Sequence, residues 1–219
     1  YTPPGYSSAR KYPVLYLLHG ASGDEKTWVQ SVRADAILDN LYAEKKLVPM
    51  IVVMPSCLPA DAREQAGDSR EAKARAGRAF SEVLLRDLIP FVEAKYPALS
   101  GREHRALAGL SMGAGLAFST GLTHPETFAW VGAFSGGSTR RLADRLRADF
   151  SSTDRQLRLL WLSVGDSDNL MLEGMMSADA FLTEKKITHT FRINDGGHEP
   201  EVWKNDLYHF APLLFQGAR

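Results

Sequence analysis

Short apolar runs separated by amphipathic stretches dominate the hydrophobic pattern of this chain. Six segments are typical of strands, and in order they are residues 12–19, 48–55, 105–110, 128–135, 157–164 and 188–193. Several are apolar almost without interruption, as expected of a strand that is covered on both faces of a parallel sheet. The pattern therefore predicts a buried, mostly parallel central sheet.

Stretches with the spacing of a helix lie between these segments. We expect helices over residues 31–46, 80–96, 112–122, 171–185 and 203–215, with Pro90 kinking or ending the second of them. Strands that alternate with helices imply right-handed crossovers. The fold class is thus predicted to be α/β, with helices on both faces of the sheet.

Residues 58–79 differ from the rest of the chain because they are rich in Ala, Arg, Asp and Glu and poor in large apolar side chains. This composition predicts a solvated loop or a loose helix. The segment follows the C-terminal end of a predicted strand, which is where ligands bind in open α/β sheets. We expect a mobile rim over the site, with a plain surface insertion as the alternative.

Length and charge narrow the classes of partner. A chain of 219 residues with 44% hydrophobic residues fits one domain, residues 1–219. The 26 basic and 26 acidic residues balance, so the composition does not favour nucleic acid or an anionic membrane. No apolar run approaches the roughly 20 residues of a membrane span. Cys57 is the only cysteine and cannot form an internal disulfide.

The stretch Gly109-Leu-Ser111-Met-Gly113 lies where the third predicted strand meets a helix. We interpret it as a nucleophile elbow, a tight turn that exposes a serine hydroxyl and needs glycines because a Cβ would collide with the neighbouring backbone. A glycine-serine turn without chemistry is the alternative. The context of strand and helix favours the elbow.

A serine hydroxyl needs a base, and the base needs an acid that holds it in one tautomer. His198 follows the last predicted strand in a glycine-rich turn, and Asp168 follows the strand before it. The order Ser, Asp, His is that of an α/β-hydrolase. Asp166 is the main alternative to Asp168 as the acid, and Asp195 is a weaker one. His19 is expected to be structural.

Backbone and aromatic groups complete the predicted site. The amides of Met112 and Ala21 are expected to form an oxyanion hole, since the first follows the serine and the second lies after the first strand. Trp28 and Trp203 could wall an acyl pocket, although large rings at such positions are often core residues. We predict no metal and no cofactor, because the sequence has neither a metal-ligand spacing nor a phosphate-binding loop.

Several stretches resemble the esterase D and feruloyl esterase group, which is close to family 1 of the carbohydrate esterases. They span most of the chain and read Pro13-Val-Leu-Tyr-Leu-Leu-His-Gly, Gly23-Asp-Glu-Lys-Thr-Trp28, His104-Arg-Ala-Leu-Ala-Gly-Leu-Ser-Met-Gly, Phe128-Ala-Trp-Val-Gly-Ala-Phe-Ser-Gly-Gly and Gly196-Gly-His-Glu.

The resemblance implies a cofactor-free serine esterase with the α/β-hydrolase fold. Ser111 would be the nucleophile, Asp168 the acid and His198 the base, with Ala21 and Met112 as the oxyanion amides. It also implies a secreted or periplasmic protein, and a chain that lacks one or two N-terminal strands of its relatives and sometimes a carbohydrate-binding module. Ala114 and Pro200 depart from the group, which commonly has a second glycine and a tryptophan there.

The leading hypothesis is an ester hydrolase that releases ferulic or related hydroxycinnamic acids from plant cell-wall polysaccharides. An acetyl xylan esterase, an S-formylglutathione hydrolase, a siderophore esterase and an acyltransferase are alternatives with the same fold. A binding protein that kept the fold and lost the reaction is the alternative from another class. The expected partner is a small-molecule or polysaccharide ester, and the sequence does not predict an oligomeric state.

Overall fold

The computed structural model describes residues 1–21, 23–57, 70–137 and 157–217. Six parallel strands form one sheet in the order β2-β1-β3-β4-β5-β6. The strands are β1 Val14–Leu18, β2 Ile51–Val53, β3 Arg105–Leu110, β4 Trp130–Phe134, β5 Leu159–Gly165 and β6 Thr190–Asn194. Each lies within or beside a segment predicted to be a strand, and the α/β class is confirmed.

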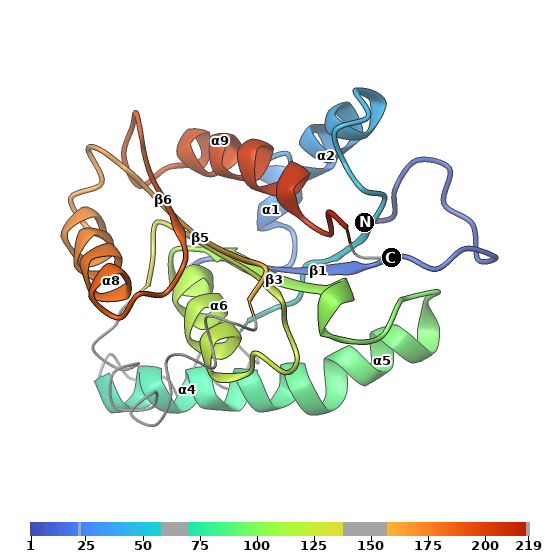
Figure 1. The fold of residues 1–219 in the computed structure, drawn as a ribbon, viewed down its shortest axis with the longest axis horizontal. Coiled ribbons are helices and arrows are strands. Elements are labelled where there is room, and N and C mark those ends of the chain that lie inside the picture. The colour runs from blue at the N-terminus through green and yellow to red at the C-terminus, as the bar shows by residue number, and fades with distance from the viewer. Residues whose placement is uncertain (22, 58–69, 138–156, 218–219) are drawn as a thin grey trace.

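Helices cover both faces of this sheet (Figure 1). One face carries α1 Thr27–Gln30, α2 Ala34–Ala43 and α9 Pro200–Phe210. The other face carries α4 Arg70–Val83, α5 Ile89–Lys95, α6 Met112–Thr123 and α8 Leu172–Glu184. Right-handed crossovers place the helix after β1 on the opposite face from those after β2 and β3, because the strand order reverses at β1.

The reversal at β1 creates the crevice in which open α/β sheets bind ligands. β1 pairs with β2 on one side and with β3 on the other, so the connections that leave the ends of β1 and β3 run to opposite faces. Ligands bind at such a switch point, beyond the carboxyl ends of the strands. The loop after β1 and the turn after β3 therefore flank the expected site.

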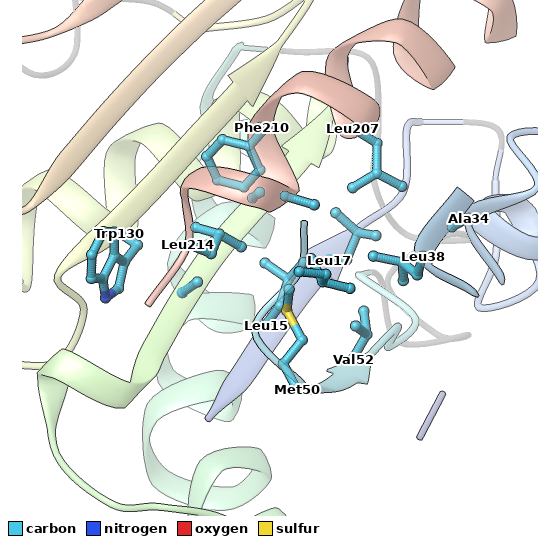
Figure 2. Packing of buried hydrophobic residues seen from close by; sticks show 14 of the residues in the cluster. Leu15, Leu17, Ala34, Leu38, Met50, Val52, Trp130, Leu207, Phe210 and Leu214 are labelled. Carbon is cyan, nitrogen blue, oxygen red and sulfur yellow. The ribbon is translucent and has the colours of Figure 1, made fainter. Parts of the chain in front are cut away.

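Alternating side chains of the sheet divide the core between the two faces. Leu15 and Leu17 of β1 pack toward α2 and α9, where they join Leu38, Leu207 and other buried residues (Figure 2). Tyr16 and Leu18 point to the opposite face. Full burial of a leucine side chain contributes about 1.5–3 kcal/mol, so these layers supply much of the driving force for folding.

The helix predicted over residues 80–96 is present, and it is disturbed next to Pro90 as expected. The structure has α4 to Val83, a π-helical segment η1 Leu84–Leu88, and then α5 Ile89–Lys95. Pro90 lacks an N–H group and its ring would clash with the carbonyl four residues earlier, which explains the wider turn immediately before it. The expected disturbance at Pro90 is thus a local widening of the helix.

Two other boundaries differ from the prediction. The helix α2 begins at Ala34 because Arg33 has a left-handed backbone with φ of 59°, and α9 begins three residues earlier than expected, at Pro200. Residues 70–79 of the predicted rim belong to α4, and residues 58–69 lie outside the described part of the chain. Short 3₁₀ turns η2 Arg102–His104 and η4 Ala211–Leu213 complete the described elements, none of which is long and apolar enough to cross a membrane.

A carboxyl group is buried between α9 and the sheet. Asp206 is 1% exposed, and its Oδ1 accepts a hydrogen bond of 2.6 Å from Nδ2 of Asn194 at the end of β6. Burial raises the pKa of Asp206 to about 7, although the Ser163 hydroxyl, the Asn194 amide and the charge of Arg192 oppose the shift. Loss of hydration in the apolar interior outweighs these interactions.

We predict that Asp206→Asn stabilises the protein more at pH 8 than at pH 5. The folded pKa is raised above the unfolded one, so the free energy of unfolding of the wild type falls as pH rises toward about 7. The variant has no carboxyl group at this position, so its free energy of unfolding does not fall in this way. The difference in free energy of unfolding between variant and wild type should therefore increase by about 2–3 kcal/mol from pH 5 to pH 8. Denaturant unfolding at both values measures it, and an equal effect at pH 5 and pH 8 would contradict the raised pKa.

Candidate active site

Ser111 joins β3 to α6 in a strained turn. Its φ is 53° and its ψ is −117°, a backbone conformation that costs a residue with a Cβ about 1–3 kcal/mol. Its N–H group donates to the carbonyl of Phe134 at 2.9 Å, which ties the turn to the end of β4. The strain is therefore held in place by the neighbouring strand.

The glycines of the predicted elbow are required by close backbone contacts. A Cβ on Gly109 would lie 2.5 Å from the carbonyl carbon of Gly113. A Cβ on Gly113 would lie 2.5 Å from the carbonyl oxygens of both Leu18 and His19. Real side chains do not approach backbone atoms this closely, so the first turn of α6 packs against the ends of β1 and β3 only because these positions lack side chains.

Ser111, His198 and Asp168 form a continuous chain of hydrogen bonds in the structure. Nε2 of His198 is 2.9 Å from Oγ of Ser111, and Nδ1 of His198 is 2.8 Å from Oδ2 of Asp168. The side chain of His198 is 20% exposed, whereas that of Asp168 is fully buried. A carboxylate accepts hydrogen bonds and does not donate them, so in this arrangement Nδ1 carries the ring proton and Nε2 accepts the hydrogen bond from the Ser111 hydroxyl.

Asp168 lies in the turn that precedes α8, whose first residue is Leu172. Its Oδ1 accepts hydrogen bonds from the amides of Leu170 at 3.2 Å and Met171 at 3.0 Å. These two bonds hold Oδ1 within the turn. One carboxyl group therefore stabilises the turn before α8 with one oxygen and contacts the imidazole with the other.

Asp166, the alternative acid, lies in a different position. Its Oδ1 accepts from the Ser167 hydroxyl at 2.8 Å and from the amide of Gly196 at 3.1 Å. These two hydrogen bonds, in that order of strength, lower the pKa of this exposed carboxyl. The structure thus places Asp168 against the imidazole, while Asp166 braces the glycine turn before His198.

The two predicted oxyanion residues belong to the two segments that meet at Ser111, the start of α6 and the loop after β1. Met112 is the first residue of α6, where the amides have no acceptor within the helix. Ala21 follows Gly20, on which a Cβ would lie 3.4 Å from the Cβ of Ser111. The loop after β1 therefore runs directly past the serine, as the topological argument predicted.

His19 is structural, in agreement with its interpretation from the sequence. The ring is 1% exposed, with Nδ1 2.7 Å from the carbonyl of Gly20, and Nε2 accepts from the amide of Cys57 at 2.9 Å. It links the loop that contains Ala21 to the segment after β2.

The structure affects the predictions for Trp28 and Trp203 differently. Trp28 was a candidate for the substrate pocket, and this prediction is wrong because the ring is 1% exposed, donates from Nε1 to the carbonyl of Leu18 and packs on Phe134. Trp203 packs edge-to-face with the ring of His198, at 5.2 Å between centroids and 88° between planes. It contacts the candidate base, and whether it also contacts a substrate stays a prediction.

The polar contacts behind His198 were not predicted. Asn194 lies at the end of β6 and bonds to Asp206, four residues after the buried Val202 of α9. A usable sequence signal is the acidic residue four positions after Val202, because it shares the inner face of the helix and a buried polar side chain needs a partner.

Comparison with known proteins places these features in a family. The family model described as "Putative esterase" matches residues 1–216. An endo-1,4-beta-xylanase/feruloyl esterase of Xylanibacter ruminicola is 30% identical over 99% of this chain, which spans 29% of that protein. The iron(III) enterobactin esterase of Escherichia coli K12 is 26% identical over 93% of the chain and half of its own length. The chain thus spans 29% of the length of the first relative and 50% of the length of the second.

A solved structure shares the fold. The CE1 ferulic acid esterase of Anaeromyces mucronatus in complex with ferulic acid superposes with a TM-score of 0.80 over 100% of this chain and 84% of that one, at 23% identity. The six-stranded parallel sheet with helices on both faces is accordingly that of the α/β-hydrolase fold, as the resemblance implied.

We predict opposite effects for alanine at two neighbouring glycines of α6. Gly113→Ala should lower the melting temperature, because the new methyl meets two carbonyl oxygens and such overpacking costs about 1–3 kcal/mol. Gly115→Ala is the matched control. Its Cβ would have no neighbour within 4 Å, so this change should stabilise the helix by about 0.5–1 kcal/mol. Similar melting temperatures for the two variants would argue against the close packing at the elbow.

Proposed function

The chain belongs to the esterase family identified above, and we propose that it is a serine carboxylic-ester hydrolase whose reacting groups are Ser111, His198 and Asp168. The single observation that carries the proposal is the line of hydrogen bonds from the serine through the imidazole to the buried carboxylate, at 2.9 and 2.8 Å. Its reaction follows from these three groups and needs no cofactor.

In the first step, Oγ of Ser111 attacks the ester carbonyl while its proton moves to Nε2 of His198. Asp168 stays ionised, holds the ring in one tautomer and stabilises the imidazolium that forms. The carbonyl oxygen becomes an oxyanion, which we propose is bound by the amides of Met112 and Ala21. Loss of one such donor typically raises the barrier by about 3 kcal/mol.

In the second step, the tetrahedral intermediate expels the alcohol, which takes the proton from His198 and leaves an acyl group on Ser111. A water molecule then attacks the acyl-enzyme while His198 takes its proton, and the bond between the acyl carbon and Oγ breaks as that proton passes to Ser111, which releases the acid product. The partly exposed ring of His198 supports this step, because water must reach its Nε2 face.

We propose an ester of a hydroxycinnamic acid, such as ferulic acid, as the substrate class. Support comes from the relatives, since one curated protein is named a xylanase/feruloyl esterase and one related structure contains ferulic acid. Such esters occur on plant cell-wall polysaccharides, so the proposed location is outside the cytoplasm, secreted or periplasmic. A siderophore ester is a second candidate, favoured by the similarity to the enterobactin esterase over 93% of the chain.

The substrate class can be tested by comparing hydrolysis of methyl ferulate, 4-nitrophenyl acetate, S-formylglutathione and enterobactin. We expect kcat/KM to be highest for methyl ferulate, and Ser111→Ala to lower it on the order of 10⁶-fold while the melting temperature stays close to wild type. Fast turnover of enterobactin but not ferulate would favour the second candidate. Full activity of the alanine variant would overturn the nucleophile, and a folded wild type that neither turns over esters nor forms a fluorophosphonate adduct would favour a binding protein.

The two aspartates after β5 provide a matched test of the acid. Asp168→Asn should lower kcat on the order of 10⁴-fold, because an amide can donate to Nδ1 and thereby stabilise the wrong tautomer of His198. Its Oδ1 can still accept from Leu170 and Met171, so the helix start should survive. Asp166→Asn removes an exposed charge that does not touch the ring, and we expect kcat within a few-fold of wild type. Equal losses for both variants would contradict the assignment.

A further inference from the structure

The turn that carries His198 is anchored at both ends, by two elements that we call its stems, β6 and α9. It leaves the end of β6 at Asn194 and enters α9 at Pro200, so the imidazole is supported by an edge strand on one side and by the first turn of a helix on the other. Nothing in the hydrogen bond between His198 and Ser111 fixes the distance between these stems. Asp168 orients the ring and Asp166 braces Gly196, and the attachment of α9 to β6 is a further determinant of where the base lies.

Asn194 makes this attachment through three groups. Its Nδ2 donates to Oδ1 of Asp206 at 2.6 Å, its Oδ1 accepts from Nδ2 of Asn205 at 3.0 Å, and its backbone carbonyl accepts from the amide of Asp166 at 2.8 Å. The side chain of Asn194 is 7% exposed and that of Asp206 is 1% exposed. Both side-chain bonds reach α9, and the third reaches the loop before Asp168.

The first turn of α9 meets the turn that carries His198. The ring of Trp203 packs edge-to-face on the imidazole, and a Cβ on Gly196 would lie 2.8 Å from Cγ2 of Val202. Asp206 lies one helical turn further along the same helix, on the buried face that also carries Val202. A shift or rotation of α9 would therefore move Trp203, which packs on the imidazole, and Val202, which lies beside Gly196 in the same turn.

We propose that Asn194 and Asp206 are positioning residues for His198, a buried clamp that sets the distance between the two stems of its turn. The inference rests on the proposed function. It assigns these residues an indirect role, because neither touches the reacting atoms.

The energetics favour a role in positioning over one in stability. A buried polar pair contributes little net stability compared with apolar residues of similar volume, and a buried carboxyl group also loses its hydration. Hydrogen bonds are directional, however, and two bonds from one amide fix both the distance and the rotation of α9. A displacement of about 1 Å at the reacting groups can cost on the order of 10²-fold in rate, so such a constraint has a large effect on turnover.

An exchange of the two side chains tests the clamp. Asn194→Asp places a second carboxylate against Asp206 at pH 8, and we expect kcat to fall 10- to 100-fold with KM within about twofold. The double variant Asn194→Asp/Asp206→Asn restores a donor opposite an acceptor and keeps the acceptor for Asn205, so kcat should return to within about threefold of wild type.

Two further variants keep the test decisive. Asn205→Ala removes only the partly buried hydrogen bond to Oδ1 of Asn194, and it should lower kcat two- to fivefold even if the Asn194→Asp protein does not fold. Thr120→Val is the control, because it deletes a buried hydrogen bond of 2.7 Å to Ser81 on the opposite face of the sheet. It should lower the melting temperature without changing kcat.

The rate of Ser111 labelling by a fluorophosphonate is measured alongside turnover, since it depends on the base and not on the natural ester. Slow labelling in Asn194→Asp that recovers in the double variant supports the clamp. Unchanged kcat and labelling in both Asn194→Asp and Asn205→Ala would overturn it, as would a double variant that regains its melting temperature but not its rate. Failure of the wild type to label or hydrolyse any ester would instead refute the proposed function.

Discussion

The contact between backbones around Ser111 is the constraint on which the rest of the structure depends. The start of α6 lies so close to the ends of β1 and β3 that Gly109 and Gly113 have no room for a Cβ. This proximity forces the serine into its left-handed conformation and exposes its side chain beyond the sheet. Burial of the apolar layers on both faces of the sheet stabilises the fold and also offsets the cost of the strained backbone at Ser111.

Parallel strands explain how three distant side chains meet. Ser111, Asp168 and His198 each follow a strand, and the carboxyl ends of β3, β5 and β6 lie along one edge of the sheet. A parallel arrangement brings every strand-to-helix connection to that edge, so polar residues at the strand ends converge without any change to the core. The turn before α8 then holds the carboxylate, and Trp203 of α9 packs on the ring of the base.

The edge strand β6 is the least secured part of this arrangement. It has one neighbour in the sheet, and its side chains are more exposed than those of the central strands. The base nevertheless lies directly beyond it. The buried hydrogen bond between Asn194 and Asp206 attaches β6 to α9, although burial raises the pKa of Asp206. Such a contact is consistent with a site in which a defined position of the base matters more than stability.

Much of this protein is determined by local pattern. Apolar runs and helical spacing identified all six strands and the α/β class, and the glycines around Ser111, the position of His198 and the preference for Asp168 followed from motif spacing. These features are readable because a period of two or 3.6 residues, or a turn that needs glycine, depends only on neighbours in the chain. Tertiary structure alone decided that Trp28 is a core residue, that Asp166 braces a turn instead of the imidazole, and that Asn194 bonds to Asp206. Such outcomes depend on which distant side chains meet after the sheet has formed, and no local period encodes that distance.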